Sequence, residues 1–250
     1  MASLSEEGSN ASFPETRWTV VLALRHGGDT TLGHRALAEL CRIYWSPLYG
    51  YARRLGNNPE DAEDLTQGFM EHVVKTEMLA TADESIGKMR SFLRKSFSNY
   101  IHNNHRAAVA KMRGGDVISV RLETLRPVEL ELEHNAIDNA SPDALYDRLC
   151  ALALVEESLA HLEAEHRTTA KAVQFAAFKQ FLDPQGMETV PQEVLAERLG
   201  MTLSNVRTTL FRLRQRFREL LRALVKDTLQ NPSEEEINEE LKSMRAALLR

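Results

Sequence analysis

The sequence predicts an all-α fold, with two helical domains joined by an extended linker and followed by a C-terminal helix. Gly and Pro are few, 12 and 8 of 250 residues, and most of them mark turns. Between the turns, apolar residues recur every three or four positions, which is the spacing of one helix face. The expected units are residues 1–12, a disordered N-terminus; 13–113, the first domain; 114–140, the linker; 141–230, the second domain; and 231–250, an acidic helical tail.

Turn and cap residues set the helix boundaries expected in the first domain. Thr16 suits the N-cap of a helix that the Gly27–Gly28 pair ends. Pro47 suits a first helical turn, so a new helix is expected to begin beside it. The run from Gly56 to Pro59 is a strong turn signal. The helices expected here cover about 17–26, 32–43, 46–55, 59–76 and 88–111.

The next segment, 116–140, alternates briefly, is acidic and has no sustained helical period, so we expect an extended linker there. Ser141 followed by Pro142 then predicts an N-cap and a first helical turn. The remaining expected helices cover about 142–166, 168–182, 192–199, 203–229 and 234–249.

The stretch from Val194 to Leu220 has the pattern of a helix-turn-helix. Gly200 stands at the tight turn, where a residue that tolerates positive φ is useful. Thr202 suits the N-cap of the second helix. The side chains expected to be buried are Val194, Leu195 and Leu199 of the first helix, Met201 between the helices, and Val206, Leu210 and Leu213 of the second.

The other sides of that second helix carry polar and basic residues and Phe211. Arg can pair bidentately with guanine and Asn with adenine in a major groove, and further arginines suit phosphates. The candidate DNA-contacting residues are Ser204, Asn205, Arg207, Thr208, Arg212 and Arg214, and Arg216, Arg218 and Arg222 continue the basic face. Taken alone, the pattern also fits an exposed basic helix on an ordinary bundle.

The net charge of −5 hides a segregation of charge along the chain. Asp and Glu concentrate at 58–64, 129–138, 156–165 and 234–240, and Arg and Lys at 88–113 and 207–226. Each block is therefore interpreted separately. The acidic residues after Pro59 also suit a first helical turn, where they favour the macrodipole without any partner.

Three segments carry a resemblance to one family. The segment LYGYARRLGNNPEDAEDLTQGFMEHVV closely resembles region 2 of bacterial sigma factors of the extracytoplasmic-function (ECF) group of the sigma-70 family. RSFLRKSFSNYIHNNHR resembles the next helix of that family, with Asn103 in place of the usual Asp. The helix-turn-helix resembles region 4. FPETRWTVVLALR and ALAELCRIYWSPLYGYARRLG look like a planctomycete-type subgroup. The linker and the tail lie outside the resemblance.

The resemblance implies a region 2-like bundle and a region 4-like helix-turn-helix, and it implies two macromolecular partners. The acidic surface would dock on the clamp coiled coil of core RNA polymerase, and the second domain would meet its flap. The residues implied at the clamp are Asp61, Glu63, Asp64 and Gln67. Complementary charge would speed this encounter and fix its register.

The second implied partner is promoter DNA. In the family the basic helix opens the minus-ten element and holds a flipped base, which implies Arg94, Lys95, Asn99, Asn103 and Arg106. The helix-turn-helix residues would bind the minus-thirty-five element. Phe92 and Phe97 are expected in the core rather than stacked on bases, and the role of Tyr100 stays open.

Several classes of protein are not indicated. The chain has no Gly-rich phosphate loop, no His-Glu-x-x-His and no Cys-x-x-Cys, so we expect no enzyme, metal or cofactor. Cys41 and Cys150 are interpreted as buried free thiols. No apolar run approaches the roughly 20 residues of a membrane span, and the N-terminus lacks the features of a signal peptide, so we expect a cytoplasmic protein.

Two other interpretations remain open. One is a stand-alone helix-turn-helix regulator, and the other is a polymerase-binding protein that has lost promoter melting, which Asn103 suggests. An anti-sigma factor, or a kinase acting on Thr66, would also fit. We further hypothesise that the tail, with its acidic run 234–236, folds over the basic helix and inhibits it.

Overall fold

The computed structural model describes residues 30–75, 87–111, 140–167, 169–182 and 190–249. These ranges are helical and contain no strand, which confirms the all-α class. The expected helix at 17–26 and the expected linker at 116–140 lie outside them. The described helices are α2 (Thr30–Arg54), α3 (Pro59–Lys75), α4 (Met89–Lys111), α6 (Pro142–Glu165), α7 (Thr169–Lys179), α8 (Gln192–Leu199), α9 (Leu203–Asp227) and α10 (Glu234–Leu248).

One helix prediction is wrong. Residues 32–43 and 46–55 were expected as two helices, but α2 runs through both with Pro47 inside it. A proline within a helix costs about 3 kcal/mol because it removes a hydrogen bond and crowds the preceding turn. Apolar side chains on both sides of Pro47, among them Tyr44 and Leu48, are almost wholly buried. Their burial, worth about 1.5–3 kcal/mol for each large side chain, offsets that cost.

The helix starts expected at Ser141 and Thr202 are confirmed, whereas the cap expected at Thr16 lies outside the described residues. The Ser141 hydroxyl accepts a hydrogen bond of 3.2 Å from the Ala144 amide at the start of α6. The Thr202 hydroxyl accepts one of 3.2 Å from the Asn205 amide at the start of α9. At α10 the side chain and backbone of Ser233 are both bonded to Glu236, which forms a capping box.

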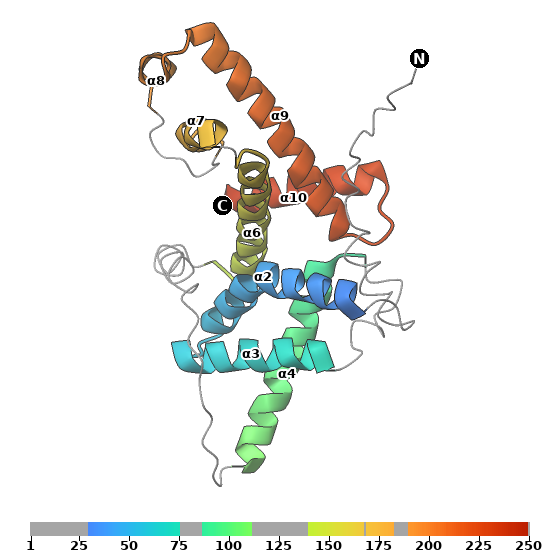
Figure 1. Ribbon diagram of the computed structural model, residues 1–250. Coiled ribbons are helices and arrows are strands. Elements are labelled where there is room, and N and C mark those ends of the chain that lie inside the picture. Colours follow the sequence, from blue (N-terminus) through green and yellow to red (C-terminus); the bar gives the residue numbers. More distant parts are fainter. Residues whose placement is uncertain (1–29, 76–86, 112–139, 168, 183–189, 250) are drawn as a thin grey trace.

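Two apolar clusters hold the helices together, and α6 contributes to both of them. The first cluster contains residues of α2, α3, α4, α6, α9 and α10, and the second contains residues of α6, α7, α8 and α9. Figure 1 shows α6 between α2 and the helices α7 and α9. The first cluster thus crosses the expected boundary between the two domains. The division of the chain into two domains stays a prediction.

An aromatic group marks the centre of the first cluster. The ring of Tyr51 on α2 lies 6.3 Å from that of Phe97 on α4 and 5.9 Å from that of Tyr146 on α6. The ring of Phe69 on α3 lies 4.9 Å from Phe97. Phe97 has no exposed surface, so its expected place in the core is confirmed. Tilted and edge-to-face ring pairs of this kind are favourable beyond their buried area.

Candidate nucleic-acid interface

The helices α8 and α9 are joined by the three-residue turn 200–202, where the sequence predicts a helix-turn-helix. α8 ends at Gly200, whose φ is +62°, as expected for the residue that tolerates this region. The amide of Met201 donates to the carbonyl of Ala196 at 2.9 Å, which closes the turn. Leu195 and Val206 have no exposed surface and belong to the same apolar cluster. The expected burial of these two side chains is confirmed.

Val194 was expected to point inward, and this prediction is wrong: its side chain is 46% exposed. Each step along a helix turns the side chain by about 100°. Leu195 and Ala196 take the inward positions of this short helix, so Val194 is turned toward the solvent.

The exposed face of α9 carries the residues expected to contact DNA. Ser204, Asn205, Arg207, Thr208, Arg212 and Arg214 are all exposed, as is Phe211. They do not share one side of the helix, however. At about 100° per residue, Arg207, Arg214 and Arg218 fall on one stripe, whereas Thr208 and Arg212 lie about 100° and about 140° from Arg207. We call Arg207, Phe211, Arg214 and Arg218 the arginine stripe.

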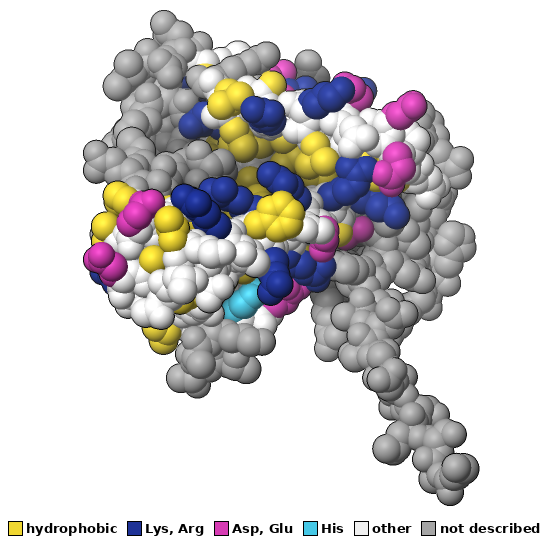
Figure 2. Space-filling model, turned by 90° about the horizontal axis from the view of Figure 1, so that it is seen from above, with side chains coloured by type: hydrophobic (Ala, Val, Ile, Leu, Met, Phe, Trp, Pro, Cys, Tyr) yellow, Lys and Arg dark blue, Asp and Glu magenta, His cyan; other side chains and the backbone are white. Residues whose placement is uncertain are grey.

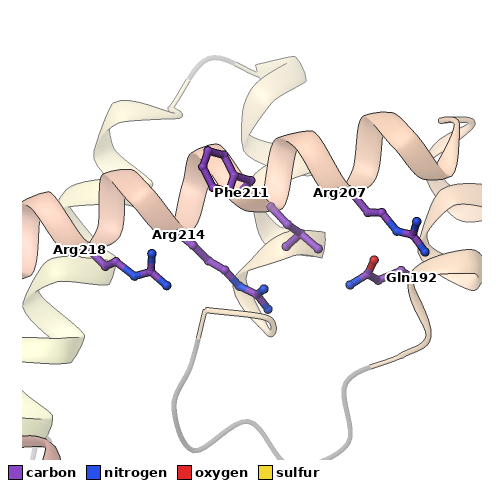
Figure 3. Close-up of a pocket in the computed structure, with 6 residues that line it drawn as sticks. Gln192, Arg207, Phe211, Arg214 and Arg218 are labelled. Atoms are coloured by element: carbon purple, nitrogen blue, oxygen red, sulfur yellow. The ribbon is translucent and has the colours of Figure 1, made fainter.

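The arginine stripe borders a hollow of about 370 Å³ between α9 and the start of α8. Figure 3 shows the side chains of Arg207, Arg214 and Arg218 extending to the same side of α9, with Gln192 of α8 opposite Arg207. Lys and Arg side chains surround a hollow with hydrophobic side chains at its base on this face (Figure 2). A guanidinium row around such a hollow is suited to a phosphate backbone.

Ion pairing separates the arginines of α9 into two groups. Arg216 is bonded to Glu165 at the end of α6 at 2.7 Å and to Glu219 at 3.1 Å. The hydrogen bonds that Arg216 donates to these carboxylates raise its pKa. Arg222 is bonded to Glu234 and to Asn238 of α10. Arg216 and Arg222 were expected to continue the basic face, but their charges are already paired within the protein.

The charges of the second group, the other four arginines of α9, are not neutralised by ion pairs in the described part of the chain. Arg207, Arg212 and Arg218 form no ion pair with any residue of the described ranges, and Arg214 donates only a 3.4 Å hydrogen bond to the carbonyl of Phe181. These cations lie in the first two-thirds of α9, the part nearest the turn. Their charge is available to an anionic partner.

The residues expected at the minus-ten element are placed less uniformly. Lys95, Asn99 and Asn103 are exposed on α4 at intervals of four, so they share one side of the helix. The side chain of Arg106 lies outside the described residues. Arg94 is partly buried and bonded to Asp143 of α6 at 2.9 Å, so it faces the protein and not the side that carries the other three.

Tyr100, whose role the sequence left open, packs against α3. Its ring lies 5.6 Å from that of Phe69 and 5.7 Å from that of His72. Phe92 also packs on the first cluster, in agreement with its expected place in the core. The aromatic residues of α4 thus fix the helix in place, and its polar side is left to contact a partner.

The acidic residues of α3 are divided between surface and interior. Asp61 and Asp64 are exposed, and Gln67 is half-buried with a 3.3 Å hydrogen bond to Glu71. Glu63 is only 6% exposed, because it is turned about 200° from Asp61 on the helix. The structure therefore does not bring Glu63 to the same exposed face.

Two further residues of α3 have local structural roles. Asp61 exchanges two hydrogen bonds of 2.8 Å with Asn58, whose side chain caps the first turn of the helix. Thr66, the candidate for phosphorylation, has no exposed surface, and its hydroxyl donates to the carbonyl of Ala62.

The cysteines are free, with Cys41 partly buried and Cys150 buried. Burial raises the pKa of both thiols. Within the described ranges no group of three or more His, Cys, Asp or Glu side chains has the arrangement of a metal site. None of the described helices is long and apolar enough to cross a membrane.

Sequence reasoning missed Gln192 at the hollow and the pairing of Arg216 with Glu165. The spacing of Arg207, Arg214 and Arg218 would have shown the stripe, since intervals of seven and four return to one helix side. Nothing local to Gln192 indicates that it lies opposite Arg207, and nothing local to Arg216 indicates Glu165, although its other partner, Glu219, is only three residues away. Comparisons of the chain with protein-family models, with curated proteins and with solved structures found no match.

Proposed function

We propose that this protein is a sigma factor of the ECF type, a subunit that directs core RNA polymerase to promoters. The observation that carries the DNA-binding part is the contrast within α9. Arg207, Arg212 and Arg218 have no ion-pair partner among the described residues, whereas Arg216 and Arg222 do. Unpaired arginines on the second helix of a helix-turn-helix suit major-groove and phosphate contacts.

The sigma assignment adds a second DNA contact and a docking surface, and both rest on the sequence resemblance. Lys95, Asn99 and Asn103 form an exposed polar side on α4, which suits an unpaired strand of the minus-ten element. Asp61 and Asp64 are exposed on α3 and would meet the basic clamp of the polymerase. The protein would act without a cofactor and in the cytoplasm, and chemistry would belong to the polymerase.

Reconstitution with core polymerase from the same organism tests this proposal. We expect the wild-type chain to form open complexes on a promoter, and the Asp61→Arg/Asp64→Arg variant to bind core polymerase about tenfold more weakly or worse, because like charges would then face each other. Glu235→Arg/Glu239→Arg, which reverses two exposed charges on α10, outside the resemblance, is the matched control and should bind core polymerase normally. A wild-type chain that ignores core polymerase would overturn the assignment.

A stand-alone helix-turn-helix regulator is the alternative, and one observation favours it. The first apolar cluster joins α2–α4 to α6, α9 and α10 in one core. In a regulator, this core would only support the helices α8 and α9, which would bind the DNA. Such a protein would bind duplex DNA tightly without core polymerase. The same reconstitution separates the two functions.

A further inference from the structure

The start of α4 is attached by its backbone to the end of α9. The amide of Met89 donates to the carbonyl of Thr228 at 3.0 Å, and the amide of Gln230 donates to the carbonyl of Gly87 at 3.2 Å. These bonds flank an antiparallel bridge between Lys88 and Leu229. Residues that are far apart in the sequence, in the two expected domains, are thereby joined at one point.

Glu240 of α10 lies beside this point and is almost wholly buried, with 2% of its side chain exposed. Its two carboxylate oxygens are bonded to two cations of the α4 start. Arg90 Nε lies 2.5 Å from Oε1, and Lys88 Nζ lies 2.7 Å from Oε2. Arg90 also bonds Asp147 of α6 and lies 3.3 Å from the hydroxyl of Ser243. One buried carboxylate thus holds α10 to α4.

The ion pairs that Arg42, Lys88, Arg90 and Arg94 of the first half form with the second half have the same polarity. Arg42 and Arg94 of the first half are bonded to Glu157 and Asp143 of the second. Together with the Glu240 cluster they form a seam with cations on α2 and α4 and carboxylates on α6 and α10. Removing one partner from a buried pair leaves an uncompensated charge and is strongly destabilising, so Glu240 is the most sensitive point of the seam.

The sequence suggested that the tail folds over the basic helix and inhibits it, but the structure places the tail elsewhere. α10 reaches α9 through Glu234 and Asn238, which bond Arg222, and the arginine stripe stays exposed. The tail therefore does not hide the DNA-contacting face of α9. Its contacts instead hold the start of α4 against the end of α9.

We call the arrangement in which the start of α4 is bonded to the end of α9 the closed form. It limits the distance between the two candidate DNA surfaces, the polar side of α4 and the exposed face of α9. Figure 1 shows α9 and α4 extending in opposite directions from the place where they meet. At 1.5 Å per helical residue, Asn103 and Ser204 lie at most about 60 Å apart along the two helices. Promoter elements centred at minus ten and minus thirty-five are separated by about 85 Å of duplex at 3.4 Å per base pair. The closed form does not span them.

We propose that α10 acts as a latch that keeps the protein in this closed form. The ion pairs of Glu240 with Lys88 and Arg90 hold the latch shut. Release of the latch frees the start of α4 from the end of α9, a step that separation of the two candidate DNA surfaces requires. The role of the open form in contacting promoter DNA rests on the proposed function, but the existence of the latch does not. Closing is a property of the free chain and is measured without polymerase or DNA.

Native-state hydrogen exchange on the free protein tests the latch. The amides of Met89 and Gln230 are bonded across the seam, so their protection reports its opening. We expect Glu240→Gln to lower both protection factors about tenfold or more. The amide of Met201, bonded within the helix-turn-helix, should keep its protection. Glu239→Gln is the matched control, since Glu239 is exposed and its ion pair is with Lys242, three residues along α10.

Three outcomes would overturn the latch: unchanged protection of Met89 and Gln230 in Glu240→Gln, equal loss at Met201, or an equal effect of Glu239→Gln. Should Glu240→Gln fail to fold, Lys88→Gln repeats the test, because the Lys88 side chain is 43% exposed and its loss is milder. A latch that opens in a chain that does not bind core polymerase would uphold this inference and refute only the sigma assignment.

Discussion

The hydroxyl oxygen of Tyr100 on α4 lies 2.5 Å from the position that a Cβ would occupy on Gly68 of α3. A methyl group there would collide with it, because non-bonded carbon and oxygen atoms do not approach so closely. The Tyr100 ring is held by Phe69 and His72, so it has little room to move aside. Gly68 thus allows the close approach of α3 and α4.

This contact predicts opposite effects of one substitution in two backgrounds. Gly68→Ala should lower the free energy of unfolding by about 1–2 kcal/mol, because it overpacks the contact. In a Tyr100→Phe background, where the hydroxyl is gone, the same change should raise it by up to about 1 kcal/mol through helix propensity. Urea denaturation of the four proteins in the cycle measures both. Equal effects of Gly68→Ala in the two backgrounds would show that the hydroxyl does not matter.

The turn between α8 and α9 depends on the backbone of Gly200. Its φ is +62°, and nothing lies within 4 Å of an added Cβ, so a substitution there meets backbone strain alone. Gly200→Ala should cost about 1 kcal/mol of unfolding free energy, and Gly200→Asn less, because Asn tolerates the left-handed region better. Chemical denaturation compares the two. An Asn variant no more stable than the Ala variant would contradict this account of the turn.

Acid should weaken the Glu240 cluster. Burial acts to raise the pKa of Glu240, but hydrogen bonds from Arg90 and Lys88 and their positive charges bring it below its ordinary value. A carboxyl whose pKa is lower in the folded state stabilises the protein above its unfolded pKa, about 4.3, and loses that contribution as the pH falls. The free energy of unfolding should therefore decline below about pH 4.5.

Removing the carboxylate isolates its share of this acid sensitivity. Between pH 5 and pH 3, the slope for Glu240→Gln should be shallower than that of wild type by up to about 1.4 kcal/mol per pH unit, the value for one proton. Urea denaturation at several pH values gives the slopes. A variant with the wild-type slope would show that Glu240 keeps the same pKa in the folded and unfolded chain.

Local signals in the sequence predicted most helix boundaries, and the structure shows why. The effects of Ser141, Thr202 and Gly200 are confined to a few residues on either side of each one. Their roles can therefore be predicted from the sequence. Pro47 was misleading because its usual place at a helix start is overridden by the burial of Tyr44 and Leu48 against other helices. Tertiary packing of this kind leaves no local trace.

The candidate site follows the same division. The exposed residues of α9 were predictable from the apolar stripe on its other side. Which arginines are already paired was not, because Arg216 and Glu165 are 51 positions apart and Arg90 and Glu240 are 150 apart. Charge blocks along the chain showed that opposite charges exist, but only the fold shows which of them meet.

The split among the arginines of α9 predicts a selective effect on DNA binding. Arg207→Gln, Arg214→Gln and Arg218→Gln should each weaken binding to a fluorescent duplex and lower the dependence of log K on log salt by about 0.9. Arg216→Gln is the matched control: the same change on the same helix, at a side chain bonded to Glu165 and Glu219. It should cost at most about 1 kcal/mol of stability and leave the salt dependence unchanged, because its charge is already neutralised within the protein. Anisotropy titrations between about 50 and 200 mM salt give the slopes. If Arg216→Gln lowered the slope as much as the other three, DNA binding would draw on the net charge of α9 and not on the arginine stripe.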